Sequence, residues 1–164
     1  MHITKSNNVI EMNGSLSIVV FDTEKNIVKQ ELFIPNLVVT TGKTFIASRV
    51  VGTSQAVMSH IGIGTSPTTE AIGDTTLGTE LTVGGGYTGY ARQAVTASVS
   101  GNVVTYSATL AANNPSAPSV GAVLREAGIF NASSGGTMLC RTTFPPVTKL
   151  PADALTISWT ITVA

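Results

Sequence analysis

Alternation of apolar and polar side chains along short segments most constrains the fold of this chain. It is clearest near the C-terminus, where the apolar positions are Leu155, Ile157, Trp159, Ile161 and Val163, with Thr or Ser between them. Successive side chains of a β-strand point to opposite faces, so this segment predicts a strand with one buried face and one Ser/Thr face. The same pattern over residues 15–20, 95–99 and 106–110 predicts further strands.

Turn residues join the predicted strands into hairpins. Ser100-Gly101-Asn102 divides a hairpin of residues 90–111, and a Ser-Ser-Gly-Gly run at 133–136 separates two strand-like segments. A polar run at 22–26 separates residues 16–21 from 27–34 in the same way. Three hairpins and a final strand predict an all-β protein with an antiparallel β-sandwich or barrel.

Helical signals are few. Thr41-Gly42-Lys43 opens a segment in which apolar residues recur at helical spacing until Gly52, which predicts one short helix. A second helical turn over residues 74–81 is expected if Asp74 serves as its N-cap.

Pro35 interrupts the pattern after the first hairpin. We therefore expect residues 1–35 to form an N-terminal arm and β-hairpin, and residues 36–164 to form the β-sandwich domain. An isolated hairpin is marginal in water, so this one must pack on the main domain or on a neighbouring subunit. The irregular Pro/Asn/Ser segment 111–121 is expected to be an exposed loop that carries contacts.

The charge content limits the function classes. Only 11% of the 164 residues are charged, and nine Lys and Arg balance nine Asp and Glu. Nucleic-acid binding depends largely on neutralising phosphates, so no nucleic-acid partner is expected. Near-zero net charge instead promotes association between copies. No apolar run is long enough to span a membrane, the first residues lack the apolar core of a secretory signal, and the single cysteine, Cys140, suits a reducing cytoplasm.

The sequence contains residues that occur in cofactor-binding and catalytic motifs, but the neighbouring residues that such motifs need are absent. Residues 84–89, GGGYTG, match G-x-G-x-x-G, but the following residues alternate like a strand, whereas a dinucleotide site needs a helix there. His60 has no acidic or cysteine neighbour in sequence, His2 lies at the chain tip, and Cys140 is expected to be a packed strand residue.

Carboxylates offer no predicted site either. Glu126 and Arg125 are adjacent in a strand and point to opposite faces. Glu70, Asp74 and Glu80 share a Gly/Thr-rich segment without calcium-loop spacing, and we expect a solvated loop. The sequence therefore predicts no catalytic residue, no cofactor, no metal site and no enzyme activity.

Several short phrases stand out from residue 36 onward. In chain order they are residues 36–43 (NLVVTTGK), 47–49 (ASR), 58–64 (MSHIGIG), 74–81 (DTTLGTEL), 126–131 (EAGIFN), 138–141 (MLCR) and 155–160 (LTISWT). In this order they resemble a family of tailed-bacteriophage virion proteins. Together they are spread from residue 36 to residue 160. The resemblance carries no catalytic residues.

The resemblance implies a capsid decoration (cement) protein. Such proteins resemble jelly rolls, sit as homotrimers at local threefold positions and clamp neighbouring copies of the major capsid protein. The expected location is the capsid shell of the virion, assembled in the host cytoplasm, with the major capsid protein and the chain itself as partners. A similar layout opens tail-fibre and collar proteins, so a tail, collar or baseplate fibre-attachment protein is the alternative.

A carbohydrate-binding β-sandwich module is the second alternative. Tyr87 and Tyr90, beside the glycine-rich run, are the residues that would offer a stacking platform for a sugar. For the capsid reading, the expected partner contacts come from the arm and from the irregular loop. They are Met1, Ile3, Val9 and Ile10 in the arm, and Asn113, Asn114, Pro115 and Pro118 in the loop.

Overall fold

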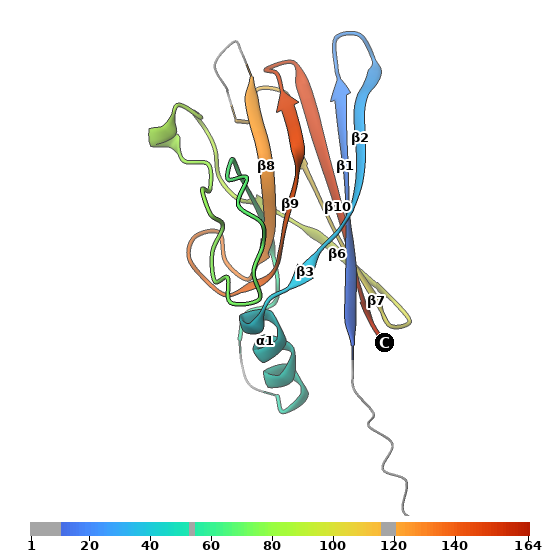
Figure 1. The fold of residues 1–164 in the computed structure, drawn as a ribbon. Coiled ribbons are helices and arrows are strands. Elements are labelled where there is room, and N and C mark those ends of the chain that lie inside the picture. Colours follow the sequence, from blue (N-terminus) through green and yellow to red (C-terminus); the bar gives the residue numbers. More distant parts are fainter. Residues whose placement is uncertain (1–10, 53–54, 116–120) are drawn as a thin grey trace, which may run out of the picture.

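The computed structural model describes residues 11–52, 55–115 and 121–164 of the chain. Two five-stranded antiparallel sheets pack face to face, with one α-helix at the end of the sandwich (Figure 1). The antiparallel β-sandwich with one short helix that the sequence predicts is confirmed.

The strand order divides the chain between two sheets. Sheet A has the order β2 (Ile27–Pro35), β1 (Met12–Asp22), β10 (Asp153–Val163), β7 (Val103–Leu110) and β6 (Thr96–Ser100). Sheet B has the order β3 (Leu37–Val38), β9 (Met138–Lys149), β8 (Ala122–Phe130), β4 (His60–Gly64) and β5 (Gln93–Ala94). The helices are α1 (Thr40–Val50) and a single 3₁₀ turn, η1 (Val83–Gly85).

All three predicted hairpins are present: β1–β2, β6–β7 and β8–β9. Each stays within one sheet. In a jelly roll, two Greek keys fold over both sheets and consecutive strands mostly cross between them, so the strand order here is a different one.

The N-terminal hairpin is an integral part of sheet A. β1 lies between β2 and β10 and pairs with β10 along its whole length, from Met12 opposite Val163 to Asp22 opposite Asp153. The predicted boundary at residue 35 falls where the chain crosses from sheet A to sheet B, between β2 and β3.

The core lies between the inner faces of the two sheets. Trp159, Leu16 and Ile157 of sheet A are fully buried there, as are Ile129 and Cys140 of sheet B. The alternation near the C-terminus therefore describes a real buried face, and Cys140 is a packed strand residue as predicted. Burial raises the pKa of the Cys140 thiol well above its usual range, which removes it as a nucleophile.

Helix α1 forms where the sequence predicts it and packs on β9. Gly42 approaches the Leu139 carbonyl so closely that a Cβ would collide with it, and Phe45 is buried. The predicted helical turn at 74–81 is wrong. Asp74 accepts a hydrogen bond from the N–H of Ala71, which precedes it, so its carboxylate caps no helix.

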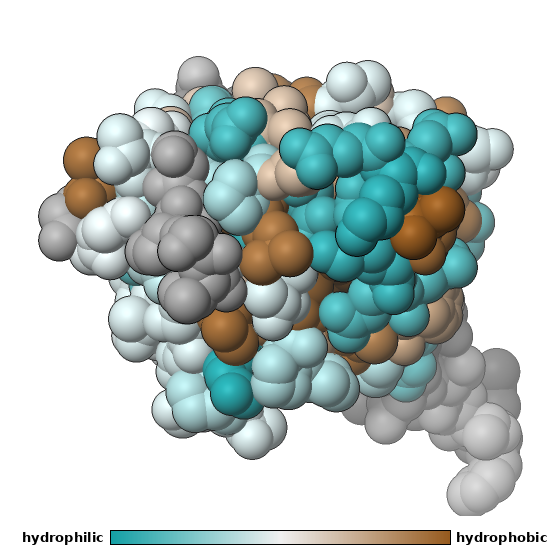
Figure 2. All heavy atoms as spheres, turned by 90° about the horizontal axis from the view of Figure 1, so that it is seen from above, coloured by the Kyte–Doolittle hydropathy of each residue, from teal (hydrophilic) through white to brown (hydrophobic). Residues whose placement is uncertain are grey.

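The two sheets differ in how their outer faces are covered. Residues 65–92 form a long loop over the outer face of sheet B, where Leu77 packs with Val39, Phe130 and Met138 in a second, smaller cluster. The outer face of sheet A carries side chains that are half-buried or exposed. Figure 2 views the molecule from the end that carries the β1–β2 turn, and hydrophilic side chains gather on one side of this end.

Candidate functional site

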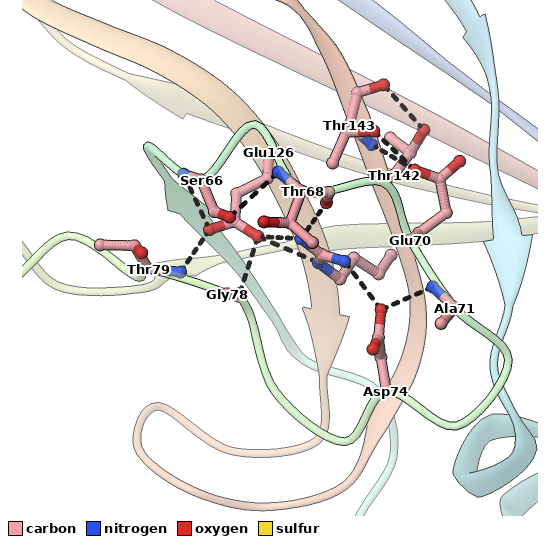
Figure 3. A network of polar contacts seen from close by, with 11 residues as sticks. Ser66, Thr68, Glu70, Ala71, Asp74, Gly78, Thr79, Glu126, Thr142 and Thr143 are labelled. Carbon is pink, nitrogen blue, oxygen red and sulfur yellow. Dashed lines mark hydrogen bonds and ion pairs between the residues drawn. The ribbon is translucent and has the colours of Figure 1, made fainter.

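The densest group of charged side chains lies between the outer face of sheet B and the covering loop (Figure 3). Glu126 reaches this face because of a β-bulge: Leu124 pairs with Val147, whereas Glu126 pairs with Thr143. Between these two pairs β8 advances by two residues and β9 by four, so the extra residues lie in β9. At this bulge the side chains of β8 change sides, so that Leu124 faces the core and Glu126 faces the loop. Without the bulge, both side chains would point into the apolar core.

Glu126 is fully buried, and both of its carboxylate oxygens are occupied. Oε1 accepts hydrogen bonds from the backbone N–H of Thr79 at 2.7 Å and of Ser66 at 3.3 Å. Oε2 accepts from the N–H of Gly78 at 2.9 Å and from Nε of Arg141 at 3.0 Å. The carboxylate therefore organises the loop backbone, because it accepts hydrogen bonds from three of the loop's N–H groups.

Arg141, in β9, contacts two further residues of the loop. Its Nη1 lies 2.7 Å from Oδ2 of Asp74, and its Nη2 donates to the Thr68 carbonyl at 2.8 Å. Burial acts to lower the pKa of Arg141, but the carboxylates of Asp74 and Glu126 outweigh this and raise it. The guanidinium is a permanent cation that bridges two carboxylates.

The three carboxylates of the loop are anchored, not solvated as the sequence suggested. Glu70 Oε2 accepts from Oγ1 of Thr143 at 2.6 Å, Asp74 pairs with Arg141, and Glu80 pairs with Arg92. They point to three different partners, and among the described residues no three His, Cys, Asp or Glu side chains are grouped to hold a metal ion.

A second ionic cluster fixes the other end of the loop. Arg92 donates from Nε and Nη2 to the two oxygens of Glu80, at 2.7 and 2.8 Å, and its guanidinium lies 3.5 Å from the centre of the Phe130 ring. Its Nη1 also donates to the Gly135 carbonyl in the β8–β9 turn. This guanidinium therefore joins the loop to both sheet B and the β8–β9 turn.

The two tyrosines considered as a sugar platform face the protein. Both are half-buried and pack against the core. The Tyr90 hydroxyl donates to Glu80 and accepts from the Ile63 N–H, and burial raises the pKa of this phenol well above its usual range. Neither ring lies free on the surface for stacking.

An open depression of about 470 Å³ lies beside the Arg141 network. Its polar lining includes Ser66, Asp74 and Arg141, but these groups are engaged with one another or with the loop backbone. Nucleophilic catalysis needs a hydroxyl or thiol hydrogen-bonded to a base, and the hydrogen bonds of these three side chains contain no such pair. The network stabilises the loop and sets the shape of this depression.

The predicted contact residues lie apart from this network. Asn113 is exposed just after β7, Asn114 is half-buried and Pro115 is buried. The Asn113 N–H donates to the Pro151 carbonyl, which attaches this segment to the β9–β10 turn. Met1, Ile3, Val9, Ile10 and Pro118 lie outside the described residues, as does His2. His60 begins β4, and its Nδ1 lies 2.8 Å from the Ser59 hydroxyl.

The outer face of sheet A is the candidate interaction surface. Across β1, β10, β7 and β6 this face contains no charged residue and consists mostly of Ser and Thr. We call it the Ser/Thr face, and its hydroxyl-bearing residues are Ser15, Ser17, Thr96, Ser98, Ser100, Thr105, Ser107, Thr109, Thr156, Ser158, Thr160 and Thr162. Sequence alternation indicated this face on the individual strands, but only the strand order shows that four strands place it side by side.

Hydroxyl groups on this face pair across strands. Ser15 and Thr160 lie 2.8 Å apart, Thr109 and Thr156 lie 3.1 Å apart, and a weaker contact of 3.4 Å joins Ser107 and Ser158. These pairs satisfy six of the twelve hydroxyls within the sheet, which lowers the cost of removing that part of the face from water.

Comparisons with known proteins give no identification: no family model, no curated protein and no solved structure matches the chain. None of the helices in the described part of the chain is long and apolar enough to cross a membrane.

Proposed function

We propose that this protein is a non-enzymatic structural component of a phage virion, a capsid decoration protein that binds the assembled shell. The observation that carries the proposal is the uncharged Ser/Thr face, which extends over four adjacent strands of sheet A. Depletion of charge is the compositional signal of the buried centre of a protein interface.

The arrangement of the ionic groups supports a binding role over a catalytic one. Glu126, Arg141 and Arg92 are nearly fully buried and hold the loop on sheet B. These ion pairs fix the loop on sheet B, and surfaces that are already rigid lose little conformational entropy on binding.

The proposed location rests on the phrases of the sequence that resemble phage virion proteins. Those phrases include the segments that form α1, β4, β8 and β10, so they extend over both sheets. A shell under internal pressure gains from many weak contacts of one kind, since copies that bind side by side make the total attachment strong.

Copy number in purified virions tests the proposal. We expect a number of copies comparable to that of the major capsid protein, measured by quantitative mass spectrometry of whole particles. A handful of copies per particle would instead place the protein in the tail or collar. Complete absence from the particle would overturn both locations.

A variant of the Ser/Thr face tests the surface itself. Thr109 is exposed in the middle of this face, so Thr109→Lys adds a charge there without disturbing the core. We expect the folded variant to bind particles at least about tenfold more weakly, because an unpaired charge must lose its hydration. Thr68→Lys, on the loop over sheet B, is the matched control and should bind like the parent protein.

A further inference from the structure

We propose that two copies of this chain associate by antiparallel pairing of their β6 strands, which joins two copies of sheet A into one continuous ten-stranded sheet. This goes beyond the proposed function, since it assigns self-association to the free edge of sheet A along β6, whose Thr96, Ser98 and Ser100 side chains also belong to the Ser/Thr face. It rests on the properties of the sheet edges.

Four strands form the edges of the two sheets, and three of them are protected. β3 and β5 have two residues each, which is too short to pair with another chain. β2 carries Lys29, Glu31 and a terminal Pro35, and a bulge interrupts its pairing with β1. Charge, proline and bulges are the devices by which natural sheet edges avoid pairing.

The fourth edge, β6, has none of these devices. Its sequence, Thr96-Ala97-Ser98-Val99-Ser100, contains no charge and no proline, and its pairing with β7 is regular over all five residues. All five residues are exposed, and Val99 is 72% exposed although it belongs to the face that is buried elsewhere in sheet A. Alternate residues of this strand direct their N–H and C=O groups away from β7, towards the side on which sheet A has no further strand.

The sequence of β6 is complementary to itself. In an antiparallel pair centred on Ser98, Thr96 of one copy lies opposite Ser100 of the other, and Ala97 lies opposite Val99. Hydroxyl residues then meet hydroxyl residues on the outer face, and apolar residues meet on the inner face, which are favourable cross-strand pairs. A twofold axis that passes between the two Ser98 residues makes the contact identical for both copies, as in most homodimers.

The distribution of charge in sheet A favours this edge for self-association. Its charged side chains gather in the β1–β2 hairpin, with Asp22, Glu24, Lys25, Lys29 and Glu31, at the far edge from β6. Figure 2 shows the corresponding hydrophilic patch at the end of the molecule that carries the β1–β2 turn. Two β6 edges therefore approach each other without like-charge repulsion.

Sedimentation equilibrium of the full chain tests the pairing. We expect the mass of two 16.9 kDa chains at high protein concentration and dissociation on dilution. Ser98→Lys and Ser98→Asp should each weaken the dimer at least about tenfold, because the pairing places two like charges directly opposite each other. An equimolar mixture of the two variants should form a heterodimer, since the introduced ammonium and carboxylate then face each other.

Thr109→Lys serves as the control, because it adds the same charge to the same sheet but at a distance from the edge. It should dimerise like the parent protein, whereas loss of the dimer in this variant would show that the sheets associate through their faces. A parent protein that stays monomeric, or that forms the trimer implied by the resemblance to decoration proteins, overturns the proposal. So does a dimer that both Ser98 variants leave intact.

The proposal of self-association and the proposed function are tested by different measurements, so that either can be overturned without the other. Ser98 variants report on self-association in purified protein, with no particle present. Copy number and the Thr109→Lys binding measurement report on the particle.

Discussion

Arg141 and Glu126 face each other from neighbouring strands on the outer side of sheet B, with Arg141 Nη2 2.9 Å and Nε 3.0 Å from the same carboxylate oxygen. Both side chains are almost completely removed from solvent. The pair stands at the base of the long loop and supplies its main polar anchor.

Removing one partner of this pair leaves a buried charge without compensation. We expect Arg141→Leu to lower the free energy of unfolding by about 3–5 kcal/mol. Urea denaturation at neutral pH measures the change. Arg125→Ala, at the half-buried neighbour of Glu126, is the matched control and should change the free energy by less than about 1 kcal/mol. Equal effects of the two substitutions would show that the buried pair contributes nothing specific.

Trp159 fills the centre of the core from β10 and is fully buried. Trp159→Ala should destabilise the protein by about 3–5 kcal/mol, through lost apolar burial and the cavity that remains. Thr156→Ala, on the opposite face of the same strand, should cost less than about 1 kcal/mol. Thermal and urea unfolding of both variants checks this, and a loss below 1 kcal/mol for Trp159→Ala contradicts the packing described here.

Acid should weaken the attachment of the loop. Partial burial acts to raise the pKa of Asp74, but the Ala71 N–H and the Arg141 guanidinium outweigh it and hold the pKa below its ordinary value of 3.8. A carboxylate with a depressed folded-state pKa contributes stability that is present above its unfolded value and is lost as the pH falls through the folded value. Stability should therefore decline below about pH 4.

Asp74→Asn should make this decline shallower, because the substituted side chain no longer binds a proton in that range. Unfolding free energies between neutral pH and strongly acidic pH, measured for both proteins, give the two slopes. Identical slopes would exclude Asp74 as a contributor.

The buried side chain of Lys149 lowers the stability of the fold at neutral pH. Its side chain is 1% exposed at the end of β9, and Nζ has no hydrogen-bond partner within the described segments of the chain. Burial lowers the pKa of this amine, and the nearby Asp153 only partly opposes the shift. Folding must therefore carry the cost of a buried cation at neutral pH.

Lys149→Met should increase the free energy of unfolding at neutral pH, since an apolar side chain of similar length needs no hydration. The gain should shrink as the pH rises through the folded-state pKa towards the unfolded value of about 10.5, because the native amine then becomes neutral. Denaturation at two pH values measures this. A less stable variant at neutral pH would contradict it.

The N-terminal arm is tested by deletion. Every strand of sheet A lies within the described residues from Met12 onward, so a chain that lacks residues 1–10 should keep its unfolding midpoint to within a few degrees. Under the decoration hypothesis, this chain should bind particles much more weakly than the parent protein. Full retention of binding would place the capsid contact elsewhere, with Asn113 and the Ser/Thr face as the remaining candidates.

Local alternation predicted the strands and hairpins because each depends on residues close together in sequence. The Ser100-Gly101-Asn102 turn is one example: Gly101 takes a positive φ of 58°, which glycine adopts without strain. The side chains of β10 alternate between core and outer face as expected. Strand order depends on pairings such as Leu16 with Trp159, which are distant in sequence and leave no local signal.

The polar network escaped prediction for a related reason. Strict alternation from Leu124 would place Glu126 in the core, and only the bulge turns it towards the loop. Its partner, Arg141, lies on the next strand, whereas the sequence analysis considered only its neighbour Arg125, which points to the opposite face. Pro145 and Pro146 lie within the bulged part of β9 and are the one signal of irregular pairing at this point, since proline inside a sheet is confined to edges and bulges.

The pairing of β1 with β10 has a consequence for the order of folding during synthesis. β1 emerges from the ribosome before every other described strand, yet its neighbour on the side away from β2 is β10, the last of the described strands. Until β10 is released, the β1–β2 hairpin has a free inner edge, and half of the sandwich core has no cover. Sheet A must therefore close after translation has reached Val163, in a step dominated by contacts between the two ends of the chain, which is the slow kind of β-sheet folding.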